Sequence, residues 1–337
     1  MRKTLDAKLA AIHADPQGCR EFIIADAKDA DMALGVTAPG PKPGGGYKTL
    51  EEYRDQIRAV VRQGIVDIML MSASNVEQLA VHEKLFESSE VTPAARANDT
   101  TDIWLPRGGK YAQSASRPFR SASIDHIKYG EATEHHAQSV RGADLGLYSL
   151  TFVNDRDRDY ETLAAYARFR EEAEQKKFRH FLEVFNPNVN GAVPGEEVGS
   201  FLNDHIVRAL AGITSSQRPL FLKIPYNSPA ALEELAAYDP HLVVGVLGGG
   251  AGTTRDAFQL IHDARKHGAR VALFGRKINY SEHPLAFIAC LRQIAQDELA
   301  PTEAVKAYHA ELKKAGITPL RSLPADLELT DTALHYD

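Results

Sequence analysis

Short apolar runs alternate with longer amphipathic segments from about residue 22 to residue 297. This alternation is typical of repeated strand and helix units, in which the strands form a parallel sheet. Strands are expected at Phe22–Ala27, Val66–Ser72, Thr101–Leu105, Leu147–Asn154, His180–Phe185, Leu220–Tyr226, Leu242–Leu247 and Arg270–Phe274. Helices are expected near 49–63, 75–88, 131–142, 157–177, 195–212, 228–237, 254–267 and 283–297. Eight such pairs predict an α/β protein with the (β/α)8 TIM-barrel fold.

The ends of these elements are not equally well defined. Thr49 precedes two glutamates, and Ser228 precedes a proline, so both are expected to cap a helix. The third unit is ambiguous, because residues 101–130 form a long segment with two strand-like stretches. The third strand is therefore either 101–105 or 123–128.

The length and composition favour one soluble domain. The chain has 337 residues and no repeat or low-complexity linker that would divide it. We expect a single barrel, with an N-terminal helical segment over about 1–20 and a C-terminal helix and tail over about 300–337. The net charge of −6 argues against a nucleic-acid partner, and no apolar run is long enough for a membrane span.

Cysteine usage and the tail add two further expectations. The two cysteines have neither disulfide nor metal spacing, which fits a cytoplasmic protein. The irregular segment TPLRSLPADLELTD near the C-terminus is expected to pack on a neighbouring subunit, so we expect a homo-oligomer.

One lysine interrupts an apolar strand, in the segment PLFLKIPYN at 219–227. Because side chains alternate along a strand, Lys223 shares a face with Phe221 and Pro225, opposite to Leu222 and Ile224. In a barrel this face points to the axis, near the C-terminal mouth. Removing an amine from water favours its neutral form, which attacks carbonyl carbons to give a Schiff base. The alternative is a structural salt bridge across the barrel.

Two carboxylates and a second lysine are expected to meet Lys223. Glu183, in RHFLEVFN, shares the inward face of its strand with Phe181. Asp26, in FIIADAKD, is also placed inward, and Lys28 follows on the same face. Together they would supply a nucleophile and general acid–base groups, with Lys28 keeping Lys223 neutral by charge repulsion. Each carboxylate is alternatively an ion-pair partner only.

Glycines gather after the seventh and eighth expected strands. The segment LGGGAGTTRDAF places Gly248, Gly249 and Gly250 before a helix, and VALFGRKI places Gly275 and Arg276 after the eighth strand. Backbone N–H groups of such a loop, with a helix N-terminus behind them, can bind an anion. Barrels frequently bind phosphate at this position. The spacing matches neither a dinucleotide fingerprint nor a P-loop, and a tight turn without ligand is the alternative.

A second loop after an expected strand, at 107–123, carries only basic charges. These are Arg107, Lys110, Arg117 and Arg120. The loop is interpreted either as a solvated connection or as a rim that attracts anions.

In this order the motifs resemble the class I, metal-independent aldolases of the superfamily that includes deoxyribose-phosphate, archaeal-type fructose-bisphosphate and tagatose-bisphosphate aldolases. The resemblance covers most of 20–297 and rests on FIIADAKD, FLEVFN, LKIPYN, LGGG and LFGRKINYSEHPLAFI. It implies that Lys223 forms the imine and that Asp26 orients or activates the substrate. It also implies that the glycine loops and Arg276 hold a phosphate. Glu183 matches the tagatose-bisphosphate pattern better than the archaeal one.

The expected activity is therefore reversible aldol cleavage of a ketose phosphate or a related carbonyl substrate. Glu183 is the preferred proton acceptor. No histidine, cysteine or carboxylate cluster has metal spacing, so we expect no metal and no organic cofactor. The alternatives are a transaldolase-like or thiolase-like transferase on the same barrel, or a barrel that only binds sugar phosphate.

Overall fold

The computed structural model describes residues 2–42, 44–132, 139–250 and 252–336. Its eight-stranded sheet confirms the expected fold class, a (β/α)8 barrel. The barrel strands are β1 (Ile23–Lys28), β2 (Ile68–Met71), β3 (Thr92–Arg96), β6 (Leu145–Thr151), β7 (Arg179–Phe185), β8 (Leu222–Lys223), β9 (Gly245–Leu247) and β10 (Val271–Phe274). A parallel bridge between Ile224 and Val246 joins β8 to β9, the two ends of the hydrogen-bonded order, so the sheet closes.

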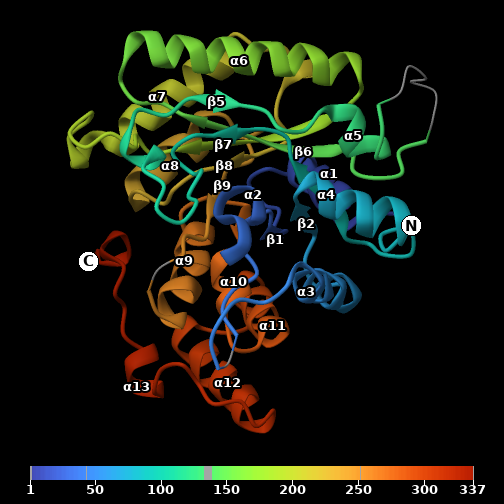
Figure 1. Cartoon of the computed structure of the whole chain (residues 1–337). Coiled ribbons are helices and arrows are strands. Elements are labelled where there is room, and N and C mark those ends of the chain that lie inside the picture. The colour runs from blue at the N-terminus through green and yellow to red at the C-terminus, as the bar shows by residue number, and fades with distance from the viewer. Residues whose placement is uncertain (1, 43, 133–138, 251, 337) are drawn as a thin grey trace.

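Helices lie around the outside of the sheet (Figure 1). They are α1 (Thr4–Ala14), α2 (Asp31–Leu34), α3 (Leu50–Gln63), α4 (Ala73–Val76), α5 (Ile124–Tyr129), α6 (Arg156–Gln175), α7 (Val198–Ala211), α8 (Pro229–Tyr238), α9 (Thr254–Lys266), α10 (Arg276–Tyr280), α11 (Pro284–Ala295), α12 (Pro301–Lys314) and α13 (Leu323–Asp326). A short antiparallel pair, β4 (Asp99–Thr100) and β5 (Pro118–Phe119), follows β3. Within the described residues, no helix is both long and apolar enough to cross a bilayer.

Several helices begin where local chemistry predicts. The Thr49 side chain accepts from the Glu52 N–H, and the Glu52 carboxylate accepts from the Thr49 N–H, so a capping box starts α3. Gly64 ends α3 in the left-handed region, at φ 71°. Ser228 caps α8 by accepting from the Ala231 N–H, and Pro229 follows it.

The apolar side chains form two cores, one inside the barrel and one between the barrel and its helices. The inner core includes Ile23, Ala25, Ala27, Ile68, Leu70, Ala94, Leu145, Leu147, Phe181, Phe221, Val271 and Leu273. Phe181 and Phe221 stack with ring centroids 4.6 Å apart. Leu5, Leu9 and Ile12 of α1 belong to the same core, so α1 closes the N-terminal end of the barrel. The C-terminal end of the barrel is not covered by α1.

The third barrel strand is neither of the two expected stretches. It is β3, which pairs with β2 on one side and β6 on the other. Residues 101–105 belong to a loop, and 123–128 fall largely in α5, where Ser123 accepts from the His126 N–H as a cap. The sequence TPAAR of β3 was missed because alanine and proline lack the bulky β-branched signal of a strand. Its small side chains fit a crowded barrel wall.

Other expected boundaries also need correction. The helix expected at 75–88 starts two residues earlier as α4 and continues to His82 in wider π-helical turns. Half of the helix expected at 131–142 falls outside the described residues, and its described ends are not helical. β8 is much shorter than 220–226, because Pro225 has no N–H to extend the ladder.

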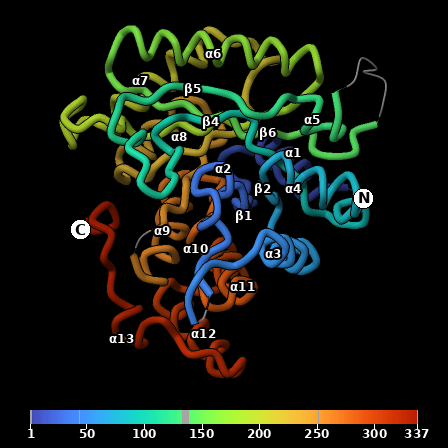
Figure 2. Tube along the Cα trace, viewed as in Figure 1, coloured from blue at the N-terminus to red at the C-terminus, as the bar shows by residue number. Residues whose placement is uncertain are grey.

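The C-terminal segment returns along α9 after α12 and α13 (Figure 2). The Thr330 N–H donates to the Asp256 carboxylate on α9, at 2.7 Å. The Tyr226 hydroxyl, three residues after Lys223, donates to the Tyr336 hydroxyl at 3.2 Å. The tail therefore packs on its own barrel near the mouth, and contact with a neighbouring subunit stays a prediction.

Candidate active site

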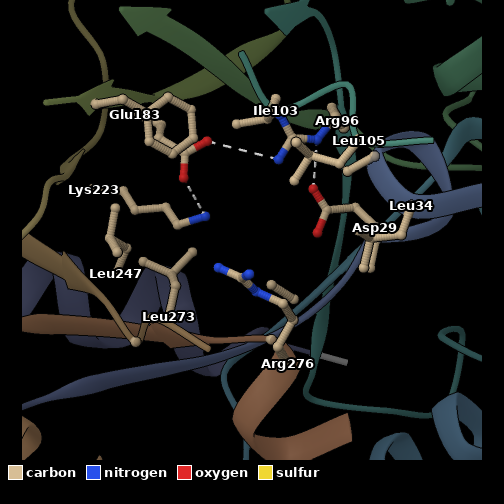
Figure 3. A pocket seen from close by; sticks show the side chains of 17 residues that line it. Asp29, Leu34, Arg96, Ile103, Leu105, Glu183, Lys223, Leu247, Leu273 and Arg276 are labelled. Atoms are coloured by element: carbon tan, nitrogen blue, oxygen red, sulfur yellow. Dashed lines mark hydrogen bonds and ion pairs between the residues drawn. The ribbon is translucent and has the colours of Figure 1, made fainter. Parts of the chain in front are cut away.

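The carboxyl ends of the barrel strands surround a cavity of about 150 Å³ (Figure 3). Active sites of (β/α)8 barrels occupy this end, because loop residues of many strands converge there. The charged residues of its lining are Asp29, Arg96, Glu183, Lys223 and Arg276. The remaining residues of the lining are glycines and apolar side chains. The cavity is thus a small apolar chamber with a few charged groups aimed into it.

Lys223 and Glu183 lie side by side on neighbouring strands. They are register partners in the β7–β8 ladder, and Nζ of Lys223 lies 2.5 Å from Oε1 of Glu183. Both side chains are almost fully buried and line the cavity. The expected inward orientation of both residues is confirmed, because Phe181 and Phe221, two residues earlier on each strand, belong to the inner core. The pair uses one carboxylate oxygen, so the other remains for further partners.

That second oxygen is held by residues on β6 and β3. The Ser149 hydroxyl donates to Oε2 of Glu183 at 2.7 Å, and it accepts from Nη1 of Arg96 at 3.1 Å. Nη2 of Arg96 lies 3.7 Å from the same Oε2. The backbone of Ser149 bonds in turn to the side chain of Asn98, at 2.6 and 2.9 Å. Glu183 is therefore fixed between a lysine on one side and an arginine on the other.

Arg96 connects this network to the loop after β1. Its Nε donates to Oδ2 of Asp29 at 2.6 Å, so the guanidinium contacts both Asp29 and Glu183. These carboxylates raise the pKa of Arg96 above its ordinary value despite burial, and it stays charged. Within this network Arg96 and Lys223 are thus matched by Asp29 and Glu183. Arg96, Asp29 and Ser149 were not predicted from the sequence. Arg96 could have been found as an inward arginine at a strand end. That would have required the third strand to be identified first.

Asp26 and Lys28 do not point into the cavity, contrary to the expectation. Ala25 and Ala27 belong to the inner core, so Asp26 and Lys28, at the alternate positions of β1, face the helices. Asp26 and Lys28 form a fully buried ion pair there, with Nζ 3.3 Å from Oδ2. Burial raises the pKa of Asp26 to about 6 and lowers the pKa of Lys28. The prediction failed because Ile23 and Ile24 are equally bulky, and the face that points inward is that of Ile23, Ala25 and Ala27.

The glycine loops approach the cavity closely, as expected. Gly248, Gly249 and Gly275 line it, whereas Gly250 lies in the neighbouring cleft under the C-terminal tail. A side chain at Gly248 would clash with the ring of Phe274, and a Cβ at Gly250 would come within 2.6 Å of the Arg276 guanidinium. The missing side chains therefore leave room for the guanidinium at the edge of the cavity.

Some N–H groups of the loop and of the helix behind it already have acceptors within the protein, and anion binding by the remaining ones stays a prediction. The N–H of Thr253 donates to the Asp256 carboxylate at 2.7 Å, which closes a capping box at the start of α9. The N–H of Thr254 donates to the Asp326 carboxylate of α13 at 2.8 Å. The N–H of Gly248 donates to the Leu273 carbonyl at 2.7 Å. Protein carboxylates thus accept from the Thr253 and Thr254 N–H groups at the start of α9, and the Arg276 side chain lines the cavity at this edge.

The fold can be compared with those of known proteins. No family model and no curated protein matches the chain. An archaeal fructose 1,6-bisphosphate aldolase structure superposes with a TM-score of 0.60 at 14% identity, covering 86% of this chain and 99% of that one. The chain thus shares the TIM-barrel fold of that structure. Cgl0159 from Corynebacterium glutamicum gives a TM-score of 0.58 at 16% identity, covering 88% and 97% of the two chains. At such identities the likeness concerns the fold alone.

Proposed function

We propose that this protein is an enzyme, a metal-independent class I aldolase that cleaves or forms a ketose phosphate through a Schiff base on Lys223. The observation that supports it most is the contact of Lys223 with Glu183 inside the cavity, at 2.5 Å. A buried amine beside a carboxylate can lose its proton without help from solvent, and a neutral amine is the nucleophile that this chemistry needs.

The first half of the reaction forms the imine. Glu183 accepts a proton from the Lys223 ammonium, and the free Nζ attacks the ketone carbon of the substrate. The resulting carbinolamine loses its hydroxyl as water, using the proton held by Glu183, and a protonated imine remains. Arg96 and Ser149 keep the Glu183 carboxylate in place throughout, because both contact its Oε2. The positive imine nitrogen then serves as the electron sink.

The second half breaks the carbon–carbon bond. Glu183, again a carboxylate, removes the proton of the hydroxyl group on the carbon that becomes the aldehyde. The electrons of the cleaved bond move to the imine nitrogen, and a neutral enamine remains on Lys223 when the aldehyde leaves. A proton returned to the enamine carbon restores the imine. Attack of water on the protonated imine then releases the ketone product and restores the Lys223 ammonium.

Arg276 is proposed to bind the phosphate of the substrate. It lies at the cavity edge next to Gly248 and Gly249, where the absence of side chains lets a ligand approach the backbone. A guanidinium forms paired bonds with phosphate oxygens. Figure 3 shows its end group directed toward the same space as the Lys223 amine. The ketone and the phosphate of one substrate can therefore be held together.

A barrel that only binds sugar phosphate is less well supported. Such a role would use Lys223 in a closed structural pair, with its amine turned away from ligands. The amine instead lines the cavity, and it contacts one oxygen of Glu183 while the other is engaged by Ser149. The transferase alternatives share the same Schiff base and differ only in the acceptor.

A substitution that removes the amine tests the proposal. Lys223→Met should reduce cleavage of a panel of ketose phosphates to background, whereas Lys110→Met, on an exposed loop at the same end, should retain turnover. The fold should survive, because Arg96 still compensates the charge of Glu183. A melting curve for each variant checks this. Wild-type turnover in Lys223→Met would rule out the lysine as nucleophile.

A further inference from the structure

We infer that the substrate carries a single anionic group and that the fragment released as the aldehyde is short and aliphatic, without a second phosphate. This inference rests on the proposed function and names its substrate class. It follows from how charge and apolar surface are divided over the cavity, with Arg276 at one edge and an aliphatic wall across from Lys223.

Most of the cations in the cavity lining already have partners within the protein. Three cationic side chains line the cavity: Arg96, Lys223 and Arg276. Each polar nitrogen of Arg96 already contacts Asp29, Ser149 or Glu183, and Lys223 contacts Glu183. Within the described part of the chain, Arg276 forms no salt bridge. Only one cation is thus left to compensate an anionic ligand group, and a second phosphate would find none.

The wall across the cavity is apolar. It consists of Ala33, Leu34, Ile103 and Leu105, contributed by α2 and by the loop after β4. Figure 3 shows Leu34, Ile103 and Leu105 on the side opposite to Lys223. Burying a phosphate against such side chains would cost its hydration without replacing it. An aliphatic fragment would instead gain from the contact.

Contacts within the protein hold this wall in place. The Leu105 N–H donates to the Ala33 carbonyl at 2.8 Å, which fixes the loop on α2. Trp104, between the two wall residues in sequence, stacks on Tyr111 at 4.3 Å and packs on Phe119 at 5.6 Å. These contacts hold Trp104 outside the cavity lining, with Ile103 and Leu105 in it.

The charged groups near the wall also disfavour a second phosphate. Asp29 lies beside Leu34 in the lining, so a phosphate at this end would meet a carboxylate (Figure 3). The basic loop expected as an anion-attracting rim does not reach inside. Arg117 and Arg120 pair with Glu161 and Glu172 on α6. Arg107 and Lys110 are exposed and absent from the cavity lining.

Condensation with a fixed donor tests the inference. With dihydroxyacetone phosphate as donor, butanal should be used with a kcat/KM at least about tenfold above that of glyceraldehyde 3-phosphate. Leu105→Arg should shift this ratio at least about tenfold toward the phosphorylated acceptor, because it places a cation in the wall. Leu320→Arg, at a side chain that is 73% exposed and far from the lining, should leave the ratio unchanged.

The outcomes separate the inference from the proposed function. A preference of the wild type for glyceraldehyde 3-phosphate, or an unchanged ratio in a folded Leu105→Arg variant, would overturn the inference. If borohydride still traps an imine in that case, the proposed function stands. If no imine is trapped and neither acceptor condenses, the proposed function is wrong and the inference falls with it.

Discussion

The amine of Lys223 lies 2.5 Å from Oε1 of Glu183, and the two residues are direct register partners on adjacent barrel strands. This contact places a proton acceptor beside the amine before any substrate binds. Because Ser149 and Arg96 hold the other carboxylate oxygen, Glu183 is positioned by groups independent of Lys223. The two functions, nucleophile and base, can therefore be separated by substitution.

Glu183→Gln should lower turnover by roughly 10²–10⁴, the usual cost of losing a general acid–base group. The amide cannot accept the proton of the substrate hydroxyl or of the Lys223 ammonium. The amine remains and can exchange its proton with water, so borohydride should still trap an imine, though more slowly. Steady-state cleavage rates measure the loss, with Glu171→Gln on the exposed surface of α6 as control. Wild-type turnover in Glu183→Gln would assign the proton transfer to another group, with Asp29 the next candidate in the cavity.

Arg276→Ala should weaken the use of phosphorylated substrates and leave an unphosphorylated analogue nearly unchanged. A charge-assisted hydrogen bond contributes about 1.5–3 kcal/mol, so kcat/KM should fall by roughly 10–10² for the phosphate ester. Arg107→Ala removes a charge at the exposed rim and serves as the matched control. Equal losses for both substrates would mean that Arg276 supports the fold or the chemistry rather than the phosphate.

Asp26→Asn should lower the free energy of unfolding by about 3–5 kcal/mol, because it leaves the fully buried Lys28 without its carboxylate. The double variant Asp26→Leu, Lys28→Met should recover most of this loss, since neither charge is then buried. Urea denaturation of the single and double variants measures both. A cost for Asp26→Asn no larger than that of a surface substitution would show that the pair does not stabilise the barrel.

Asp31 should make stability depend on pH. Burial raises the pKa of Asp31 to about 6, against about 3.9 in an unfolded chain. Between these two pKa values the folded state binds more protons than the unfolded chain. The free energy of unfolding therefore falls as pH rises from 4 to 6. Relative to Asp31→Asn, the wild type should lose on the order of 2–3 kcal/mol over this window. A constant difference between the two proteins from pH 4 to 7 would contradict the prediction.

The sequence predicted the site best where strands carry large alternating residues. On β7 and β8, Phe181 and Phe221 mark the inward face, so Glu183 and Lys223 were oriented correctly. On β1 isoleucines lie on both faces, Ile23 inside with Ala25 and Ala27, and Ile24 outside, so side-chain size did not distinguish the faces. Side-chain size therefore predicts orientation only where the two faces of a strand differ in it.

Part of the site was not predicted because β3 was not recognised as a strand. Its alanine-rich sequence gives no strand signal, so Arg96 at its end had no assigned position. Asp29 was missed for a related reason, because the loop after β1 turns inward only after the strand has ended. The occupied N-terminus of α9 depends on Asp326, more than 70 residues later, and no local pattern reveals such a contact.

Borohydride reduction in the presence of a ketose phosphate, followed by peptide mapping, tests the Schiff base most directly. The mass of the reduced substrate should appear on Lys223 alone and should be absent in Lys223→Met. Two other lysines are informative competitors. Lys28 is fully buried outside the cavity, and Lys277, whose pKa burial lowers to about 8, lies in the neighbouring cleft. Labelling of either instead of Lys223, or of no lysine with any substrate, would contradict the account.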